Sequence, residues 1–530
     1  MSPFRVLLVR PPGRFMSLEF PDGPMVGPPR SLLYLAAAVG HRQDVECRIL
    51  DALGYPDLGA IEGAARPVLF GVSPDRVAEE ASAWGADVVA ISTMANYYQR
   101  ETLEVVRAVR EALPDAFVVL GGPDPTVDAD VYLVAEPGIN AIVIGEGEAS
   151  FAELIDRLVA GEAWRDVRGI AYREQDGVVR TPNRPLIIDL DDWVPDYGLI
   201  DLEHYFHLAE RGFRSRLTYS HPGVERSVDL VTSRGCPFHC TFCTIHSTMG
   251  RRFRTRSVAS VLAQLRALVE DYDVRHVHFE DDILNLGRTR FMTLLQGIVD
   301  AEWVLTWDTP NGIRADLLDR EVIELCRESG CAYLMFGVES GSQRVLDQVV
   351  DKQLQLRAVE EAAQLCLEVG LDTMALYVVG MPGETLEEVE QTYRFAFDLF
   401  HRFGTTPLLQ LWRPYLDTTL HDRAADAGLL IDADALELHR RYGIPYTQFR
   451  DRMLASEAVS LDALSALFQR YERDLATGQL GRWRREVGPW QPAAVSPSET
   501  RESVVRFVMY EAPFPAAHLR RLGWPDQSGI

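Results

Sequence analysis

The chain of 530 residues contains almost no lysine, few cysteines and no long apolar run. Lys352 is the one lysine among 53 basic residues, and the others are arginine. No stretch approaches the ~20 apolar residues that a membrane span needs, which predicts a protein without membrane segments. Seven cysteines are too few for a disulfide-stabilised scaffold, and the first residues lack the pattern of a signal peptide. We therefore expect a cytoplasmic protein.

The chain also has fewer basic residues than acidic ones. It has 78 acidic residues against 53 basic ones, which gives a formal net charge of −25. A polyanion would repel such a chain, so we expect neither nucleic acid nor an anionic membrane as a partner. Hydrophobic residues make up 47% and charged residues 25%, which are ordinary values for a globular protein.

Two series of short apolar runs, each followed by a helix-like pattern, divide the chain. Buried parallel strands are short and rich in Val, Ile and Leu, as these runs are. The first series predicts a doubly wound, Rossmann-like α/β domain over residues 1–160, with ligands at the carboxyl ends of its strands. The second predicts a partial (β/α)6 barrel over 226–422, with its chemistry at the strand C-termini. Residues 161–225, interrupted by prolines, are predicted to be a linker, and 423–530 a helical C-terminal domain.

Three of the seven cysteines lie close together in the loop after the first predicted barrel strand. Cys236, Cys240 and Cys243 follow the pattern Cys-x3-Cys-x2-Cys, and three such thiolates can hold three irons of a [4Fe–4S] cluster. The fourth iron stays open, and it can chelate the amine and carboxylate of a substrate or cofactor. The alternative is a Cys3His zinc site with His239 or His246, although structural zinc usually takes two separated ligand pairs.

This spacing, with an aromatic residue before the last cysteine, resembles the radical S-adenosylmethionine (SAM) superfamily, in which the open iron binds the methionyl part of SAM. The resemblance implies that the three cysteines ligate the cluster and that Phe242 packs beside the adenine. It also implies SAM contacts after the later barrel strands. These are Arg314 for the SAM carboxylate, Glu339 for the SAM amine, Ser340 beside it in the Gly-x-Glu-x-Gly-Ser segment, and Gly380 of the Gly-x-Pro-Gly-Glu turn.

The first predicted domain adds to this resemblance. Its strand-end loops carry glycines with Ser, Thr and acidic residues, and the ordered set is similar to the cobalamin-binding radical SAM proteins, called class B when they methylate. Glycines let the backbone approach a bulky cofactor, and the polar side chains can hydrogen-bond its amides and nucleotide tail. The residues so implied are Asp51, Ser92, Thr93, Gly121, Gly122, Gly145, Glu146 and Glu148. The alternative is a domain that has kept the fold and lost the cofactor.

The sequence departs from many cobalamin proteins at one point. The motif Asp-x-His-x-x-Gly, whose histidine ligates cobalt, is absent, and His41 is the one histidine in residues 1–203. We therefore predict that no histidine of the protein coordinates the lower face of cobalt.

The resemblance implies a C-methyltransferase that moves a methyl group from SAM, through methylcobalamin, to a carbon radical of a small-molecule or carrier-bound substrate, such as a natural product. The cluster would need an external one-electron reductant of the flavodoxin or ferredoxin type. A substrate cavity is expected between the two domains, with Glu280, Asp281, Asp282 and Tyr377 as its predicted lining. Two alternatives remain open: a rearrangement or cyclisation with the same cofactors and no methyl transfer, and a non-catalytic cobalamin- or redox-responsive binding module.

Overall fold

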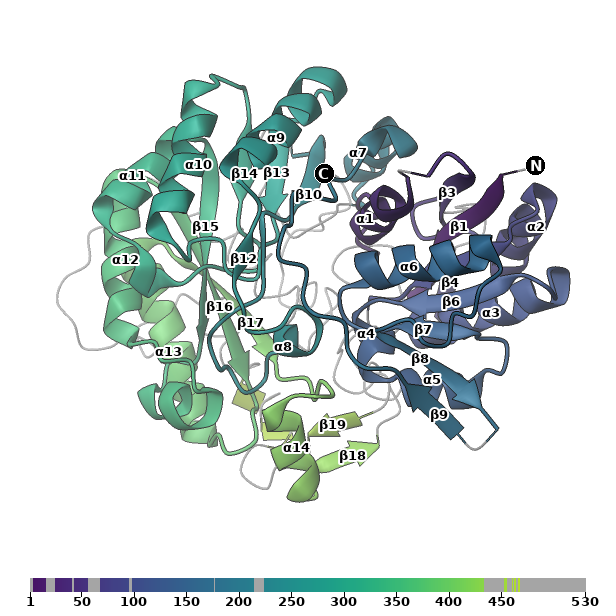
Figure 1. Cartoon of the computed structure of the whole chain (residues 1–530). Helices are drawn as coiled ribbons and strands as arrows, with labels where there is room; N and C mark the ends of the chain where they lie inside the picture. The colour runs from purple at the N-terminus through teal and green to yellow at the C-terminus, as the bar shows by residue number, and fades with distance from the viewer. Residues whose placement is uncertain are drawn as a thin grey trace.

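Two parallel sheets form the centres of two lobes that lie side by side (Figure 1). The computed structural model describes residues 3–15, 24–40, 42–55, 67–94, 98–175, 177–213, 224–432, 452–454, 460, 462–463 and 466–467. Within these residues, no helix combines the length and the apolar character that a membrane crossing requires.

The first sheet has the strand order β3-β1-β5-β6-β7-β8-β9. Its parallel strands are β1 (Phe4–Arg10), β3 (Val45–Asp51), β5 (Val88–Ser92), β6 (Phe117–Gly121) and β7 (Ala141–Val143). All five overlap with the predicted apolar runs. The central strands are apolar because both of their faces are buried, whereas β3, at the edge of the sheet, is only partly buried.

Helices cover both faces of this sheet. Apolar side chains of α1 (Arg30–Val39) and α6 (Gly147–Ala160) fill the core on one face. Those of α2 (Pro74–Trp84), α3 (Gln99–Ala112) and α5 (Ala129–Ala135) fill the core on the other. A short antiparallel pair, β2 (Gly13–Phe15) and β4 (Val68–Phe70), lies apart from the main sheet. This arrangement confirms the predicted doubly wound fold.

The segment predicted as a linker carries regular structure. Strands β8 (Ile170–Glu174) and β9 (Gly177–Arg180) extend the first sheet in antiparallel fashion. Helix α7 (Leu202–Glu210) then packs against both lobes: Phe206 joins the barrel core, whereas Tyr205 joins a small cluster of the first lobe. The connecting segment is therefore packed against both lobes at α7.

The second sheet is a partial barrel with the order β10-β13-β14-β15-β16-β17. The strands are β10 (Ser227–Leu230), β13 (His276–Phe279), β14 (Thr306–Asp308), β15 (Cys331–Glu339), β16 (Asp372–Val379) and β17 (Thr406–Leu411). All neighbours are parallel, and among the described strands β10 and β17 are unpaired on their outer edges. The six predicted βα units are thus confirmed as an open barrel.

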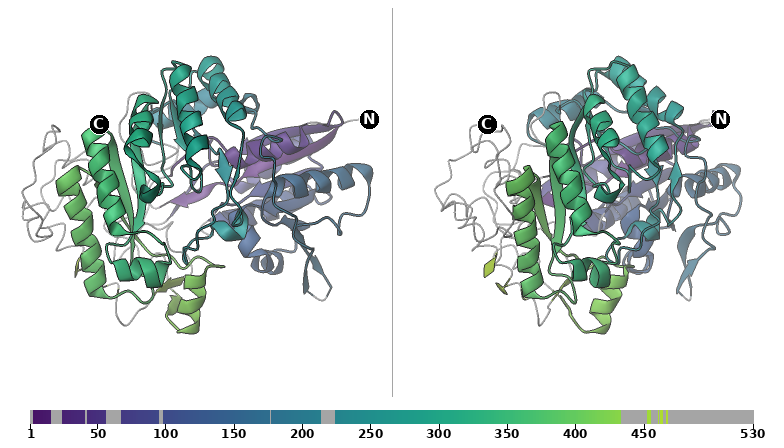
Figure 2. Two further views of the ribbon diagram at one scale, coloured as in Figure 1. Left: turned by 60° about the vertical axis from the view of Figure 1, so that its left-hand side comes forward. Right: turned by 90° about the vertical axis from the view of Figure 1, so that its left-hand side faces the viewer.

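Helices follow the barrel strands and cover their outer face, as the turned views show (Figure 2). They are α9 (Val258–Tyr272), α10 (Arg288–Asp300), α11 (Arg320–Glu328), α12 (Leu356–Val369) and α13 (Leu386–Phe403).

The start of the predicted helical C-terminal domain is mixed in structure. Helix α14 (Thr419–Asp426) is followed by an antiparallel pair, β18 (Leu430–Asp432) and β19 (Arg452–Leu454). Most of the remaining residues predicted to be helical lie outside the described part of the chain.

Candidate active site

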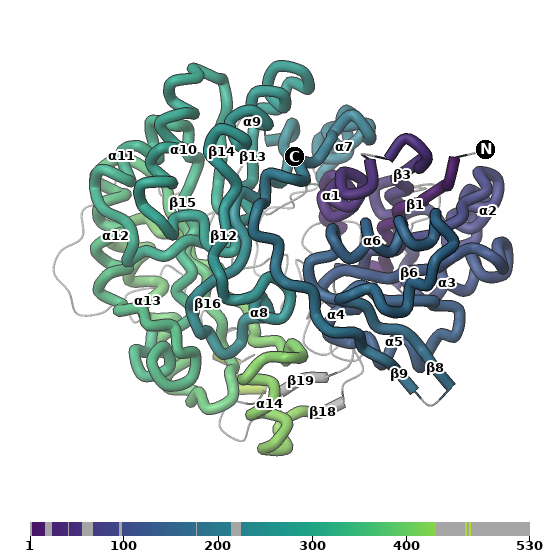
Figure 3. The backbone as a smooth tube through the Cα atoms, in the orientation of Figure 1, coloured from purple at the N-terminus to yellow at the C-terminus, as the bar shows by residue number. Residues whose placement is uncertain are grey.

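The predicted cluster loop follows β10 and runs between the two lobes (Figure 3). It begins at β11 (Ser233–Arg234), which pairs with β12 (Arg254–Thr255), so two short strands close the loop at its base. Its short helix α8 (Ile245–Thr248) lies against α4 (Pro123–Val127) of the first lobe. The loop is therefore fixed to the barrel at its base and to the neighbouring lobe along its side.

The turn into the loop requires a glycine. Gly235 has a φ of +81°, and a Cβ at this position would lie 2.4 Å from the carbonyl oxygen of Arg252. Its backbone N–H donates to Asp282 at 2.7 Å, and the N–H of Cys236 donates to the carbonyl of Gly250 at 3.3 Å. The backbone is thus held tightly immediately before the first cysteine.

The three thiols are partly buried. Cys240 and Phe242 pack against an apolar cluster that includes Met381 and Trp412. Burial raises the pKa of each thiol, that of Cys243 to about 12. The thiols are therefore protonated without iron, and cluster assembly must release their protons.

The spacing of the thiols tests the zinc alternative. With Zn–S bonds of about 2.3 Å, the sulfurs of a tetrahedral zinc site lie about 3.8 Å apart. Within the described part of the chain, the one group that places three potential ligand atoms within 4.8 Å of one another is His276, His278 and Asp308. The three cysteine sulfurs therefore do not all lie within 4.8 Å of one another, whereas a tetrahedral zinc site would hold them about 3.8 Å apart.

The acids that follow β13 hold the cluster loop. Asp281 is buried and accepts hydrogen bonds from the hydroxyl of Thr232 at 2.8 Å and from the hydroxyl of Ser233. Asp282 accepts the hydrogen bond from Gly235. Both were predicted to line a substrate cavity, but their contacts are with the protein, because the loop supplies backbone and hydroxyl donors at this strand end.

Two further predicted residues are buried among protein groups. Tyr377 is fully buried, and its ring packs edge-to-face on Phe395 with centroids 6.4 Å apart, so it belongs to the barrel core rather than to a cavity lining. The hydroxyl of Ser340 contacts that of Thr392 at 3.1 Å and accepts the N–H of Ser342 at 3.1 Å. Ser340 therefore shapes the turn after β15.

Arg314 was predicted to bind the SAM carboxylate. In the structure its guanidinium binds groups of the protein. Its guanidinium pairs with Asp316 at 2.8 Å and donates to the carbonyls of Lys352 at 3.0 Å and Gln353 at 2.8 Å. It also lies 3.8 Å from the ring centroid of Phe238, in the cluster loop. Including the bond from Nε to Asp316, four of its five N–H groups are used. Arg314 thus clamps the 352–353 segment beneath the cluster loop.

Glu339 stands at the end of β15, as predicted, and has a partner that the sequence analysis did not identify. Its φ is +72°, which is strained for a residue with a side chain. Its Oε1 lies 2.6 Å from Nζ of Lys352. Burial alone would lower the pKa of Lys352, but Glu339 and nearby Cys240 raise it overall, so the amine stays protonated.

Gly380 lies in the turn after β16. It has a φ of +80°, and its N–H donates to Glu384 at 2.6 Å, as does that of Met381 at 3.1 Å. Burial raises the pKa of Glu384 to about 8, although these two N–H groups oppose the shift. The turn is therefore closed by its own glutamate.

A cavity of about 200 Å³ opens at the carboxyl edge of the first sheet, between the strand ends and helices α1 and α6. Ser92 lines it, 3.2 Å from the hydroxyl of Ser31. At Gly121 and Gly145 an added Cβ would meet no atom closer than 3.9 Å, so a side chain there would fill the cavity. The predicted cofactor residues that line it are Ser92, Gly121, Gly122, Gly145, Glu146 and Glu148. Its position, outside the carboxyl ends of the parallel strands, is where a doubly wound sheet binds its ligand.

Two of these lining residues are also bound to the barrel lobe. Glu148 lies 2.5 Å from Arg234, and Glu146 lies 2.7 Å from Arg254. All four side chains are less than a tenth exposed. Their charges are thus neutralised across the boundary between the lobes.

A further ion pair crosses the same boundary. Arg30, at the start of α1, lies 2.8 Å from Glu280, at the end of β13. The buried carboxylate of Glu280, predicted to line a substrate cavity, therefore fixes the first lobe to the barrel.

Two other residues predicted to bind cobalamin lie outside the cavity lining. Asp51 accepts hydrogen bonds from Arg10 at 2.6 and 2.5 Å and from the hydroxyl of Tyr205 at 2.6 Å, so it connects β1, β3 and α7. Thr93 is fully buried, with its hydroxyl 2.8 Å from that of Thr102. His41 lies outside the described residues, so the absence of a histidine on cobalt stays a prediction.

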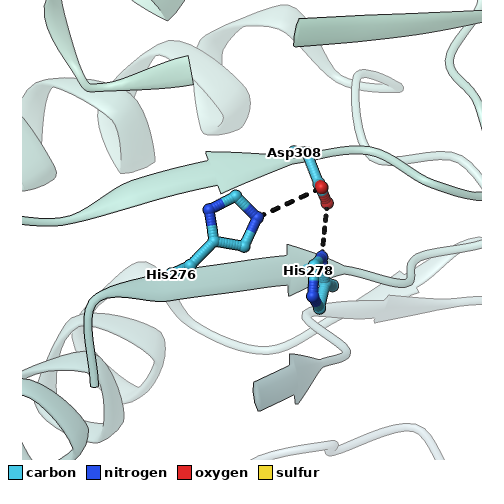
Figure 4. Close-up of side chains that lie close together, drawn as sticks. All are labelled: His276, His278 and Asp308. Carbon is cyan, nitrogen blue, oxygen red and sulfur yellow. Dashed lines mark hydrogen bonds and ion pairs between the residues drawn. The ribbon is translucent and has the colours of Figure 1, made fainter. Parts of the chain in front are cut away.

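Inside the barrel, two imidazoles share one carboxylate (Figure 4). Oδ2 of Asp308 lies 3.1 Å from Nε2 of His276, and Oδ1 lies 2.8 Å from Nδ1 of His278. Burial disfavours ionisation of both groups, but their attraction lowers the pKa of Asp308 and raises that of His278. Each imidazole faces a different oxygen, which is the geometry of a hydrogen-bonded network.

Sequence reasoning missed the basic partners of the buried acids. Arg30, Arg234 and Arg254 gave no signal, because arginines are spread throughout the chain. Lys352 did give a signal in the sequence, because it is the single lysine of the chain.

The matches to family models follow the two lobes. Residues 24–155 match the B12 binding domain, and residues 230–396 match the radical SAM superfamily. The fold and the site therefore define a radical SAM enzyme with a cobalamin-binding domain.

The chain has full-length relatives. It is 30% identical to an uncharacterized methyltransferase of Pyrococcus horikoshii, over 81% of this chain and 85% of the relative. It is 28% identical to the cytidylyl-2-hydroxyethylphosphonate methyltransferase of Streptomyces wedmorensis, over 76% and 80%. It is also 28% identical to the anaerobic magnesium-protoporphyrin IX monomethyl ester cyclase of Rubrivivax gelatinosus, over 82% and 80%.

A solved structure shares the fold. The radical SAM methyltransferase TsrM of Kitasatospora setae, with cobalamin and a [4Fe–4S] cluster bound, superposes with a TM-score of 0.64. The identity is 19%, over 94% of this chain and 92% of that chain.

The chain belongs to the cobalamin-dependent radical SAM enzymes. Its cofactors are a [4Fe–4S] cluster, SAM and cobalamin. Three alternatives from the sequence analysis are thereby set aside: a zinc site at the cysteines, a first domain that has lost its cofactor, and a non-catalytic binding module.

Proposed function

We propose that this enzyme methylates a carbon atom of a small-molecule substrate, with SAM as the source of the methyl group and cobalamin as its carrier. One observation carries the proposal: Arg234, Thr248 and Met249 of the cluster loop form part of the wall of the cavity in the first lobe. A cofactor held in that cavity lies against the loop that holds the cluster. Such proximity suits a reaction in which one cofactor activates a carbon and the other delivers a group to it.

The residues of this chain bind and orient the reactants. When bound, the cluster and SAM supply a radical that removes hydrogen from the substrate carbon, and cobalamin supplies the methyl group. We assign Cys236, Cys240 and Cys243 to the cluster and Phe242 and Gly380 to the adenosine part of SAM. The ion pairs of Arg30, Arg234 and Arg254 with acids of the opposite lobe keep the two sites at a fixed separation. The reducing electron comes from an external donor of the flavodoxin or ferredoxin type.

A second candidate function uses the same cofactors without methyl transfer. The cyclase of Rubrivivax gelatinosus is as similar to this chain as the methyltransferase of Streptomyces wedmorensis, at 28% identity each. A hydrogen abstraction followed by ring closure or rearrangement is therefore the alternative.

Isotope labelling separates the two functions. The anaerobically reconstituted holoenzyme is incubated with CD3-labelled SAM, a strong reductant and fractionated small-molecule extracts, and the products are analysed by mass spectrometry. We expect a product that carries one CD3 group, together with 5′-deoxyadenosine and S-adenosylhomocysteine. Formation of 5′-deoxyadenosine with an unlabelled product would support cyclisation, and a labelled product without 5′-deoxyadenosine would support polar methyl transfer. The triple variant Cys236→Ala, Cys240→Ala, Cys243→Ala is the control and should form no 5′-deoxyadenosine.

A further inference from the structure

A long stretch of the chain around the cluster loop has no acidic residue. Between Asp229 and Glu270 the sequence holds six arginines and no Asp or Glu, although the whole chain has 78 acidic residues and a formal net charge of −25. This stretch contains the three cysteines that we assign to the cluster. A protein with a large negative net charge thus carries a basic segment at its redox centre.

Two of these arginines are left at the surface with their charge. Three others are buried and paired with acids from other segments, and these are Arg234, Arg254 and Arg256. Arg251 and Arg252 are exposed, and within the described residues neither forms an ion pair. They lie between α8 and β12, where the two lobes meet (Figure 1). Nη1 of Arg251 donates to the carbonyl of Phe238 at 3.2 Å, between the first two cysteines, so this charge lies against the loop that holds the cluster.

The cluster loop adds an imidazole to these two guanidinium groups. His239, directly before the second cysteine, is exposed. Burial and the charge of Arg251 lower the pKa of His246, and His239 contributes in the same direction, so these three side chains lie close together. We call Arg251, Arg252 and His239 the basic patch.

Exposed apolar side chains lie beside the same loop. The hydroxyl of Ser247, in α8, donates to the carbonyl of Asp417 at 3.4 Å. The two residues before Asp417 are Tyr415 and Leu416, which are 41% and 39% exposed. Asp417 adds one exposed acid there, against the two arginines of the basic patch. Arginine and aromatic residues are enriched in the contact areas of protein partners, so this surface suits a protein rather than a small ion.

An acidic one-electron carrier protein complements this surface. The rest of the chain would repel such a carrier, whereas a local positive potential steers it to one place. We propose that the basic patch docks a small acidic electron-carrier protein, which reduces the cluster from this side. The carrier loses one electron and the oxidised cluster gains it, and no bond is made or broken. The proposal rests on the external donor that the proposed function requires, but not on whether the product is methylated.

The test compares a protein donor with a small cationic donor. Flavodoxin, photoreduced to its hydroquinone, is mixed anaerobically with the full-length, cluster-loaded enzyme in a stopped-flow instrument, and electron paramagnetic resonance identifies the reduced cluster. In the double variant Arg251→Gln, Arg252→Gln we expect the second-order rate of reduction to fall roughly 5- to 30-fold at low salt, because steering is lost. Reduction by the methyl viologen radical cation, which a basic patch does not attract, should not become slower.

Salt and charge-matched variants separate electrostatic docking from other effects. The wild-type rate with flavodoxin should fall towards that of the double variant between about 0.01 M and about 0.5 M salt, because the screening length shortens. Arg76→Gln with Arg357→Gln removes the same charge from α2 and α12 and should leave the rate within about twofold. Arg251→Lys with Arg252→Lys keeps both charges and should retain most of the rate.

Equal slowing with both donors, or no slowing with flavodoxin, would overturn the proposal. Because Arg251 binds the carbonyl of Phe238, the iron content of the double variant is compared with that of the wild type. If the iron content is lower, Arg252→Gln alone replaces the double variant. This single variant must still slow reduction by flavodoxin at least about twofold, and an unchanged rate would refute the docking surface. A methylated product that fails to form would leave these rates unaffected, so the two proposals fail separately.

Discussion

At the scale of single residues, the backbone of the cluster loop requires a glycine at position 235. We predict that Gly235→Ala lowers the iron content below about four per chain, because a positive φ costs a side-chain residue about 1–3 kcal/mol and its Cβ would press on the carbonyl of Arg252. Iron per chain after anaerobic reconstitution is the measurement. Gly161→Ala is the control, since Gly161 has a φ of +66° with no atom within 4 Å. Equal iron loss in both variants would show that the clash is irrelevant.

A second prediction at this scale concerns the carboxylate shared inside the barrel. His278→Gln should destabilise the protein by about 3–5 kcal/mol, because it removes one partner of a buried ion pair. The pKa of His278 is raised above its usual ~6.5, so its stabilising effect is complete below that pH and fades as pH rises through the raised value. The difference in Tm between variant and wild type should therefore be larger at pH 6 than at pH 9. A difference that is independent of pH would contradict the charged pair.

Single residues also show where sequence reasoning stops. Glu339 and Asp281 are both acids at the end of a barrel strand, and nothing local distinguishes them. In the structure Asp281 is satisfied by Thr232 and Ser233, almost fifty positions away, whereas Glu339 meets Lys352. Such partners depend on tertiary contacts that no spacing rule encodes. Glycines were predicted more reliably, because their requirement arises in the backbone itself.

At the scale of elements, the parallel strands could be predicted from the sequence, but the two antiparallel strands that extend the first sheet, β8 and β9, could not. The runs that became β1, β5 and β6 have apolar, buried residues at their centres, as burial on both faces demands. Strands β8 and β9 end in charged residues, β9 lies at the edge of the sheet, and the prolines that follow favoured the prediction of a linker. Their membership of the first sheet is set by pairing with β7 rather than by composition.

Helix α6 provides a test of how one element serves both cofactors. It carries Glu148, which pairs with Arg234 two residues before the first cysteine. We predict that Glu148→Gln lowers both the cobalamin and the iron retained per chain, because the buried Arg234 would lose its shorter ion pair, at 2.5 Å, and keep only its contact with Glu146 at 3.2 Å. Both contents are measured after reconstitution and gel filtration.

The same helix supplies the control for this test. Glu153→Gln, on α6, removes a partly exposed ion pair with Arg184 and should leave both contents unchanged. Loss of cobalamin alone in Glu148→Gln would mean that the ion pair serves only the first lobe.

At the scale of the whole molecule, packing and ion pairs connect the two lobes. Helix α7 contributes side chains to the cores of both lobes, and within the described residues buried or partly buried ion pairs of Arg30, Arg234 and Arg254 cross between them. The cavity of the first lobe is closed on one side by the barrel. Binding of a ligand in that cavity should therefore stabilise the barrel as well as the first lobe against unfolding.

Calorimetry can measure this coupling. Ligand at 100 times its Kd stabilises the state that binds it by about 2.7 kcal/mol, so addition of hydroxocobalamin to the cluster-loaded enzyme should raise Tm. Because barrel residues wall the cavity, we expect the whole unfolding endotherm to shift, including the part that reports loss of the cluster. In Glu280→Gln, which removes the charge partner of Arg30, the barrel should respond less to cobalamin while the first lobe still responds. If cobalamin raises only the first lobe's transition in the wild type, the lobes unfold independently and the ion pairs between them do not couple the two cofactor sites.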